Sequence, residues 1–117
     1  MRLTTLAVLL VLATAAAAPA QEFLPGFEDV PVMAGLTALP DRGHAFDTPS
    51  GRLVESFAQG PVGRDEVRRF YRETLGELGW TATADGAFRR AGETLTIEFE
   101  GADGNLTVGF RLSPRQP

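Results

Sequence analysis

The sequence predicts an α+β domain, in which a small antiparallel sheet of about four or five strands carries one amphipathic helix on one face. Two observations predict these elements: residues 64–78 place apolar side chains at helical spacing, and residues 94–100 and 106–112 alternate apolar and polar side chains. The third observation is the dipeptide Asp85-Gly86, a strong signal for the tight turn of a β-hairpin. Short alternating strands joined by tight turns need no parallel crossover, so the expected order of elements is β-α-β-β-β-β.

The predicted helix, Arg64–Leu78, has one apolar stripe and one charged face. The stripe repeats with the 3.6-residue period and consists of Val67, Phe70, Tyr71, Leu75 and Leu78. Gly79 can adopt the left-handed conformation that ends a helix, and Trp80 is then expected to fold back on Leu75. Because a lone helix of this length is marginal in water, the stripe must pack on the strands that follow.

Five segments are predicted to be strands. They are Gly51–Gln59, Trp80–Ala84, Ala87–Ala91, Thr94–Glu100 and Leu106–Leu112. With two-residue turns, Phe88 shares a face with Ile97, whereas Trp80 falls on the other face. We expect Trp80 to precede the paired region, because it already belongs to the helix end.

Residues 1–20 have the features of a secretory signal peptide. Arg2 supplies a positive start, an apolar run follows, and Ala18-Pro19-Ala20 forms an A-x-A cleavage site. The alternatives are a membrane anchor or a buried helix, but the run is short for a membrane span. We therefore expect cleavage after Ala20 and a periplasmic or secreted protein with no stable membrane anchor after cleavage.

The composition argues against several classes of protein. The formal net charge is −4, and all 11 basic residues are arginine. An acidic chain without a basic run argues against binding to nucleic acid or to anionic membrane surfaces. The chain contains no cysteine, which excludes disulfides and also lipid attachment to a cysteine at the cleavage site.

After the signal peptide, the sequence divides into an extended, Pro-rich, apolar arm (residues 21–50), the α+β domain (residues 51–113) and a flexible tail (residues 114–117). The arm keeps no period for long, yet it is more apolar than a disordered linker usually is. Two interpretations remain open: the arm fills gaps in the core of its own domain, or it docks on a partner. Within it, Val30–Met33 could form a short edge strand.

His44 is the only histidine, and it lies between Asp41 and Asp47 in a stretch expected to be a loop. These three side chains are possible metal ligands within seven residues. A mononuclear site usually needs three or four converging ligands, often with a second histidine or a cysteine. We therefore predict no metal site and interpret His44 as an exposed loop residue.

Three carboxylates, Glu98, Glu100 and Asp103, lie near the end of one predicted strand. Glu98 and Glu100 share the outward face, a spacing compatible with acid–base catalysis but also usual for a half-solvated strand. Asp103 starts a short calcium-like sequence that lacks the longer ligand series of a calcium loop, so we interpret it as a turn. The sequence also lacks the residues for nucleophilic catalysis and a phosphate-binding loop, and no catalytic or cofactor-binding residue is predicted.

Five arginines could form a small positive patch. They are Arg68, Arg69, Arg72, Arg89 and Arg90. Acidic residues interleave with the first three on the predicted helix, which favours a solvated, self-paired face over an anion-binding site.

The pattern of the helix and the hairpin after it resembles a group of small exported bacterial proteins of unknown function. Their shared pattern is V-x-x-F-Y-x-x-x-L-x-x-x-G-W followed by a hairpin. In this chain it is carried by Val67, Phe70, Tyr71, Leu75, Leu78, Gly79 and Trp80, and then by Phe88, Arg90, Leu95 and Ile97. The segments PGFEDVPVMAGL and FDTPSGRLVE also look like the front half of such proteins. The resemblance implies the fold and no reaction, ligand or catalytic residue.

These observations predict a non-catalytic exported domain that binds another protein of the bacterial cell envelope. Export, small size, the missing catalytic sets and the apolar arm favour this function. A module that binds a small apolar or anionic ligand is the alternative. A hydrolase that uses Glu98, Glu100 or His44 is the least favoured hypothesis. No cofactor is predicted.

Overall fold

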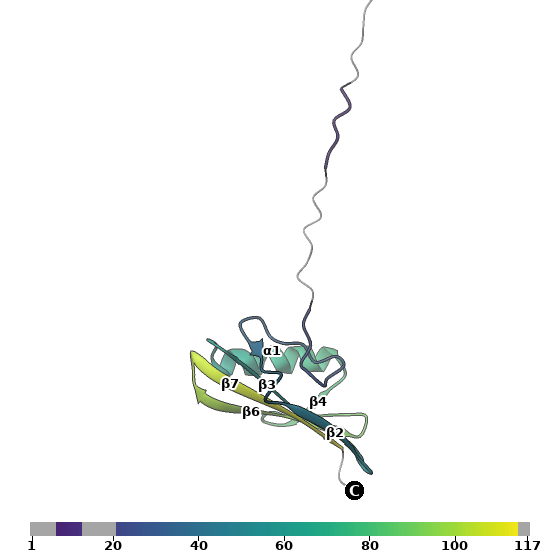
Figure 1. Ribbon diagram of the computed structural model, residues 1–117, viewed down its shortest axis with the longest axis vertical. Coiled ribbons are helices and arrows are strands. Elements are labelled where there is room, and N and C mark those ends of the chain that lie inside the picture. The colour runs from purple at the N-terminus through teal and green to yellow at the C-terminus, as the bar shows by residue number, and fades with distance from the viewer. Residues whose placement is uncertain (1–6, 13–20, 115–117) are drawn as a thin grey trace, which may run out of the picture.

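The computed structural model describes residues 7–12 and 21–114 (Figure 1). It contains one helix, α1 (Arg64–Glu77), and seven strands. The strands are β1 (Thr37–Ala38), β2 (His44–Thr48), β3 (Gly51–Gly60), β4 (Thr81–Ala84), β5 (Ala87–Arg90), β6 (Glu93–Ala102) and β7 (Asn105–Pro114). The described part of the protein is therefore an antiparallel sheet with one helix.

All strand pairs are antiparallel, and the sheet runs in the order β1-β3-β7-β6-β5-β4. The long strands β3, β7 and β6 form the centre, while β2 pairs with the outer edge of β3 next to β1. Helix α1 lies across one face of this sheet (Figure 1). The apolar stripe and the alternating strands thus meet as two layers around one core.

The predicted number and order of strands were wrong. The chain adds β1 and β2 before β3, so the order is β-β-β-α-β-β-β-β, and residues 30–33 form no strand beyond an isolated bridge between Phe23 and Pro31. The ten-residue β3 has one edge against β7, and β1 and β2 share its other edge. They satisfy backbone groups that a bare edge would leave unpaired. The sequence of β2 has no alternation of apolar and polar residues that would predict a strand. Its first four residues are exposed.

The helix ends at the predicted Gly-Trp signal. The N–H of Trp80 donates to the Leu75 carbonyl at 2.9 Å and that of Gly79 donates to the Gly76 carbonyl at 3.2 Å, with φ +90° at Gly79. These are the two hydrogen bonds of a Schellman motif, which needs a left-handed residue that glycine adopts without strain. Leu78 is the C-cap, and Trp80 precedes β4 as expected.

The segment before β1 contributes to the core. Leu24, Val30, Met33 and Leu36 are buried in the same cluster as the helix and sheet residues. The fully buried Tyr71 fastens this segment: its hydroxyl donates to the Pro31 carbonyl at 2.8 Å and accepts the Met33 N–H at 3.1 Å.

The ring of Tyr71 also packs edge-on against Phe110 of β7, with the two ring centroids 5.0 Å apart. One side chain of the helix thus contacts both the amino-terminal segment and the sheet. Burial raises the pKa of Tyr71 to about 12, while its backbone hydrogen bond with Met33 lowers that pKa by less. The neutral hydroxyl is the form that the folded protein stabilises.

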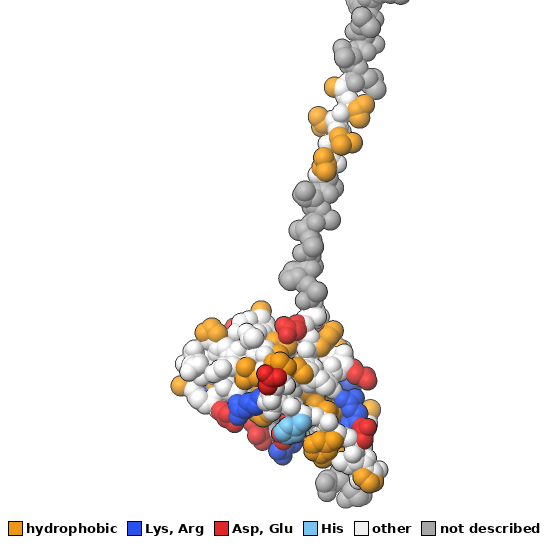
Figure 2. Space-filling view, in the orientation of Figure 1, with side chains coloured by type: hydrophobic (Ala, Val, Ile, Leu, Met, Phe, Trp, Pro, Cys, Tyr) orange, Lys and Arg blue, Asp and Glu red, His pale blue; other side chains and the backbone are white. Residues whose placement is uncertain are grey.

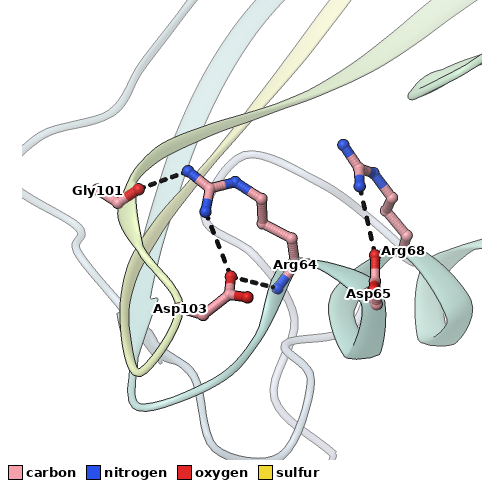
Figure 3. A network of polar contacts seen from close by, with 5 residues as sticks. All are labelled: Arg64, Asp65, Arg68, Gly101 and Asp103. Carbon is pink, nitrogen blue, oxygen red and sulfur yellow. Dashed lines mark hydrogen bonds and ion pairs between the residues drawn. The ribbon is translucent and has the colours of Figure 1, made fainter.

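The start of the helix is fastened to the β6–β7 turn (Figure 3). Gly63, at the N-cap, offers no side-chain acceptor; instead Asp103 Oδ1 accepts the backbone N–H of Arg64 at 3.1 Å and lies 3.3 Å from its guanidinium. The same guanidinium donates to the Gly101 carbonyl. The turn is also shorter than the predicted loop over residues 101–105, because β6 continues to Ala102 and β7 begins at Asn105. Asp103 is therefore a turn residue, as interpreted, that also caps a distant helix.

Several predicted features lie largely outside the described residues. Of the predicted signal peptide, only residues 7–12 are described, as exposed chain without helix or strand. Its cleavage site and residues 115–117 of the predicted tail lie outside the described part, while Pro114 belongs to β7.

Tyr71→Phe should abolish the loss of unfolding free energy that the wild-type protein shows at alkaline pH. The folded-state pKa lies above the usual value of 10, so the stabilisation is complete below pH 10 and is lost as the pH rises through 12. We expect wild-type unfolding free energy to fall by about 2–3 kcal/mol over this interval, and Tyr71→Phe to stay flat there. At pH 7 the variant should be less stable by about 1–3 kcal/mol, because two buried backbone groups lose their partner.

Urea unfolding followed by circular dichroism between pH 7 and pH 12 measures both effects. The chain has one tyrosine and neither lysine nor cysteine, so no other side chain titrates near pH 10–12. If the unfolding free energy of Tyr71→Phe falls as much at alkaline pH as that of wild type, the hydroxyl is not the source of the fall.

Asp103→Ala should lower the free energy of unfolding by about 1 kcal/mol, because the first turn of α1 loses its cap. Asp85→Ala is the matched control: Asp85 also precedes a turn glycine, but its contact is a 3.9 Å approach to Arg68. Urea titration of both variants measures the difference. Equal destabilisation by both would mean that any Asp-Gly turn matters and that capping does not.

Candidate functional site

Helix α1 and the segment before β1 cover one face of the sheet, and we call the opposite face the uncovered face. Along β3, Val54, Ser56 and Ala58 are buried, while the alternate side chains point away from the helix. The registers place eight notable side chains on the uncovered face: His44, Phe46, Leu53, Glu55, Phe57, Glu98, Glu100 and Arg111. They come from β2, β3, β6 and β7.

Three neighbouring strands bring together an ionic cluster on the uncovered face. Glu55 lies between His44 of β2 and Arg111 of β7. Its Oε2 is 3.3 Å from His44 Nε2, and its Oε1 accepts hydrogen bonds from Arg111 Nη2 at 2.7 Å and Nε at 3.1 Å. One carboxylate thus orients two side chains that are themselves mostly exposed.

A hollow of about 400 Å³ lies beside the cluster. Phe46, Leu53 and Ser113 line it together with the ionic residues. Phe46 leaves 55% of its surface exposed and stacks on His44, with the ring centroids 6.2 Å apart. Figure 2 shows the histidine at the surface with hydrophobic and charged side chains around it. The hollow therefore combines an apolar wall with donors from a guanidinium and a hydroxyl.

On the other side of Arg111, Phe57 forms the floor of a second hollow of about 220 Å³. Its ring lies over Gly109, where a Cβ atom would be only 3.1 Å from the ring, so the absent side chain makes room for it. Arg42 stacks on the outer side of Phe57 at 4.3 Å and pairs with Glu100 at 3.0 Å. The guanidinium of Arg42 is thus held between the ring of Phe57 and the carboxylate of Glu100.

The structure separates the three residues considered as metal ligands. His44 lies in β2, so its interpretation as a loop residue was wrong, and Asp47 points to the opposite face because it is three residues further along the strand. Within residues 7–12 and 21–114, no three His, Asp or Glu side chains are grouped so as to hold a metal ion.

The three predicted carboxylates also have different neighbours. Glu98 and Glu100 share the uncovered face, but Glu100 pairs with Arg42 and Asp103 caps the helix. His44 contacts Glu55 and not Glu98 or Glu100. The geometry therefore does not assemble these side chains into an acid–base pair with a histidine.

The five arginines do not form one patch. Arg89 faces away from the helix, whereas Arg90 turns inward: its guanidinium donates to Asp29 at 2.7 Å and to the Leu78 carbonyl at 2.9 Å, and it lies 4.4 Å from the centre of the Trp80 ring. On the helix, Arg68 pairs with Asp65 at 3.5 Å, as Figure 3 shows. Arg90 thus fastens the amino-terminal segment to the helix end.

Sequence reasoning missed the cluster of His44, Glu55 and Arg111. The available signal was a charged residue next to apolar ones: Glu55 follows Leu53 and Val54 in β3, and Arg111 lies between Phe110 and Leu112 in β7. Pairing them required the register of a strand pair whose members are far apart in the chain.

No protein-family model matches the chain, and comparisons with curated proteins and with solved structures give no match. The resemblance to a group of small exported bacterial proteins therefore stays a prediction. Among the described residues, the structure has no helix of the length and apolarity that a membrane span requires.

Arg90→Gln should destabilise the protein by about 1–3 kcal/mol, because Asp29 and the Leu78 carbonyl lose a charged donor and Trp80 loses its stacking partner. The neighbouring Arg89→Gln is the matched control and should change stability by less than about 0.5 kcal/mol, because Arg89 is exposed. Thermal and urea unfolding measure both. A similar loss in both variants would assign the effect to net charge.

Proposed function

We propose that this chain is an exported, non-catalytic domain that binds another protein of the bacterial cell envelope through the uncovered face of its sheet. The observation that carries the proposal is the composition of that face. Partly exposed Phe46 and Phe57 lie among Arg42, Arg111 and His44. Aromatic and arginine side chains are enriched at protein interfaces and supply most of their hot spots.

The fixed orientation of the exposed arginine side chains also supports binding. Arg111 and Arg42 expose 61% and 45% of their side chains, yet each is held by a carboxylate from another strand. A partner then meets long side chains that are already oriented, which reduces the entropy lost on association. Arg111 lies on the central strand β7, and Arg42 lies in the turn between β1 and β2.

The proposed exported location rests on the sequence of residues 1–20, which has the features of a secretory signal peptide. Its non-catalytic character rests on the neighbours of the candidate residues. His44 and Arg111 are engaged with one carboxylate, and Glu100 is engaged with Arg42.

A second candidate is a module for a small ligand with an apolar body and an anionic group. The hollow of about 400 Å³ beside Phe46 and Arg111 favours it, because ligand pockets usually measure about 300–1,000 Å³. The hollow lies on an open face, so a ligand there would stay partly exposed. Lipid or metabolite extracts that raise the melting temperature of wild type but not of Arg111→Gln would support this candidate.

A photo-crosslinking amino acid placed at Glu98 should capture one dominant envelope protein in a bacterial host that exports the domain. Glu98 is exposed on the uncovered face, whereas Glu73, the matched control position, is exposed on the outer side of α1. Mass spectrometry of crosslinked products identifies the partner. Capture from Glu73 and not from Glu98 would assign binding to the helix, and capture from neither would contradict the proposed function.

A further inference from the structure

Strand β2 forms an open edge of the sheet that is suited to the addition of another strand. It pairs with β3 in unbroken register from His44 to Thr48, and within residues 7–12 and 21–114 no strand pairs with its outer side. The opposite edge, β4, has an irregular register between Ala82 and Ala84. Bulges of this kind protect an edge from further pairing, and β2 lacks one.

The two sides of β2 present different chemistry to an added strand. On the uncovered face, Phe46 is 55% exposed and borders the larger hollow. On the helix side, Asp47 is exposed and forms no ion pair with any described residue. Directly opposed side chains of neighbouring strands interact, so an incoming strand needs an apolar side chain at one position and a basic one at the next.

We propose that β2 takes up an extended segment of a partner protein as an additional strand, with an apolar side chain opposite Phe46 and a basic side chain opposite Asp47. The inference rests on the proposed function, because it names how the partner of that same surface is held. Backbone hydrogen bonds to the edge supply affinity, and alternate side chains supply specificity. The basic residue is recognised by charge complementarity with Asp47.

A segment of a different protein fits this edge better than a second copy of the chain does. In an antiparallel pair of two β2 strands centred on Phe46, Asp47 would lie opposite Ala45 of the copy and gain no partner. The copy is therefore an outcome that the test must exclude.

The probe is the fluorescein-labelled peptide acetyl-TVRLRVT-amide. Its central leucine can lie opposite Phe46, and an arginine on either side reaches Asp47 in a parallel or an antiparallel alignment. We expect saturable binding in fluorescence polarisation and about tenfold weaker binding of acetyl-TVELEVT-amide, in which like charges oppose each other. Only alternate N–H groups of an added strand point at the sheet. N-methylation at leucine and at a neighbouring arginine should therefore have opposite results, one abolishing binding and the other largely preserving it.

Asp47→Arg should reverse the preference between the two peptides by about tenfold in each direction, since it exchanges attraction for repulsion. Glu73→Arg is the matched control: it makes the same change of charge on an exposed residue of α1, away from β2 and from the uncovered face, and the preference should persist. Phe46→Thr should weaken both peptides while it retains a residue with high strand propensity.

Three results would overturn the inference: no saturable binding of either peptide, equal effects of N-methylation at both positions, or an unchanged preference in Asp47→Arg. A wild-type dimer in analytical ultracentrifugation that Phe46→Thr dissociates would assign the edge to a second copy and would also overturn it. Crosslinking from Glu98 separates this failure from that of the proposed function. If Asp47→Arg and Phe46→Thr leave that crosslink intact, strand addition at β2 is wrong and binding through the uncovered face is retained. If wild type gives no crosslink, the proposed function itself fails.

Discussion

The hydroxyl group of Tyr71 is the interaction on which the rest of the structure depends. It bonds two backbone groups of the segment before β1, while the ring packs between that segment, the helix and β7. A buried hydroxyl without partners would cost more than the bond contributes, so this hydroxyl couples the stability of the helix to that of the segment. In a chain without cysteine, this fully buried side chain of α1 links the amino-terminal segment to the sheet.

Two half-exposed contacts complete this arrangement at opposite ends of the helix. Asp103 caps its start from the β6–β7 turn, and Arg90 joins its end to Asp29. The ion pair of Arg64 with Asp103 is exposed and adds little by itself, whereas the backbone cap from Asp103 and the part-buried contacts of Arg90 stabilise the fold. Each contact links residues that are distant in the chain to a terminus of the helix, where unpaired backbone groups need partners.

The consequence is a sheet with two unlike faces. The helix and the segment before β1 use the apolar side chains of one face, which leaves the other face to carry charges and partly exposed rings. Glu55 orients His44 and Arg111 there, and Phe57 rests on Gly109. Glu55, Phe57 and Arg111 lie on the central strands, and the edge of the sheet at β2 is open. Such a face is suited to recognition.

The sequence by itself determined the helix, its Gly-Trp end and the five strands from β3 onward, because each is encoded by a local period or a turn signal. It placed Glu98 and Glu100 on the exposed face for the same reason. Only the tertiary structure decided β1 and β2, whose exposed residues follow no period and form strands because β3 needs partners along its edge. It also decided the cluster of His44, Glu55 and Arg111, the cap from Asp103 and the inward turn of Arg90. These contacts join residues far apart in the chain, and no local pattern encodes the register that brings them together.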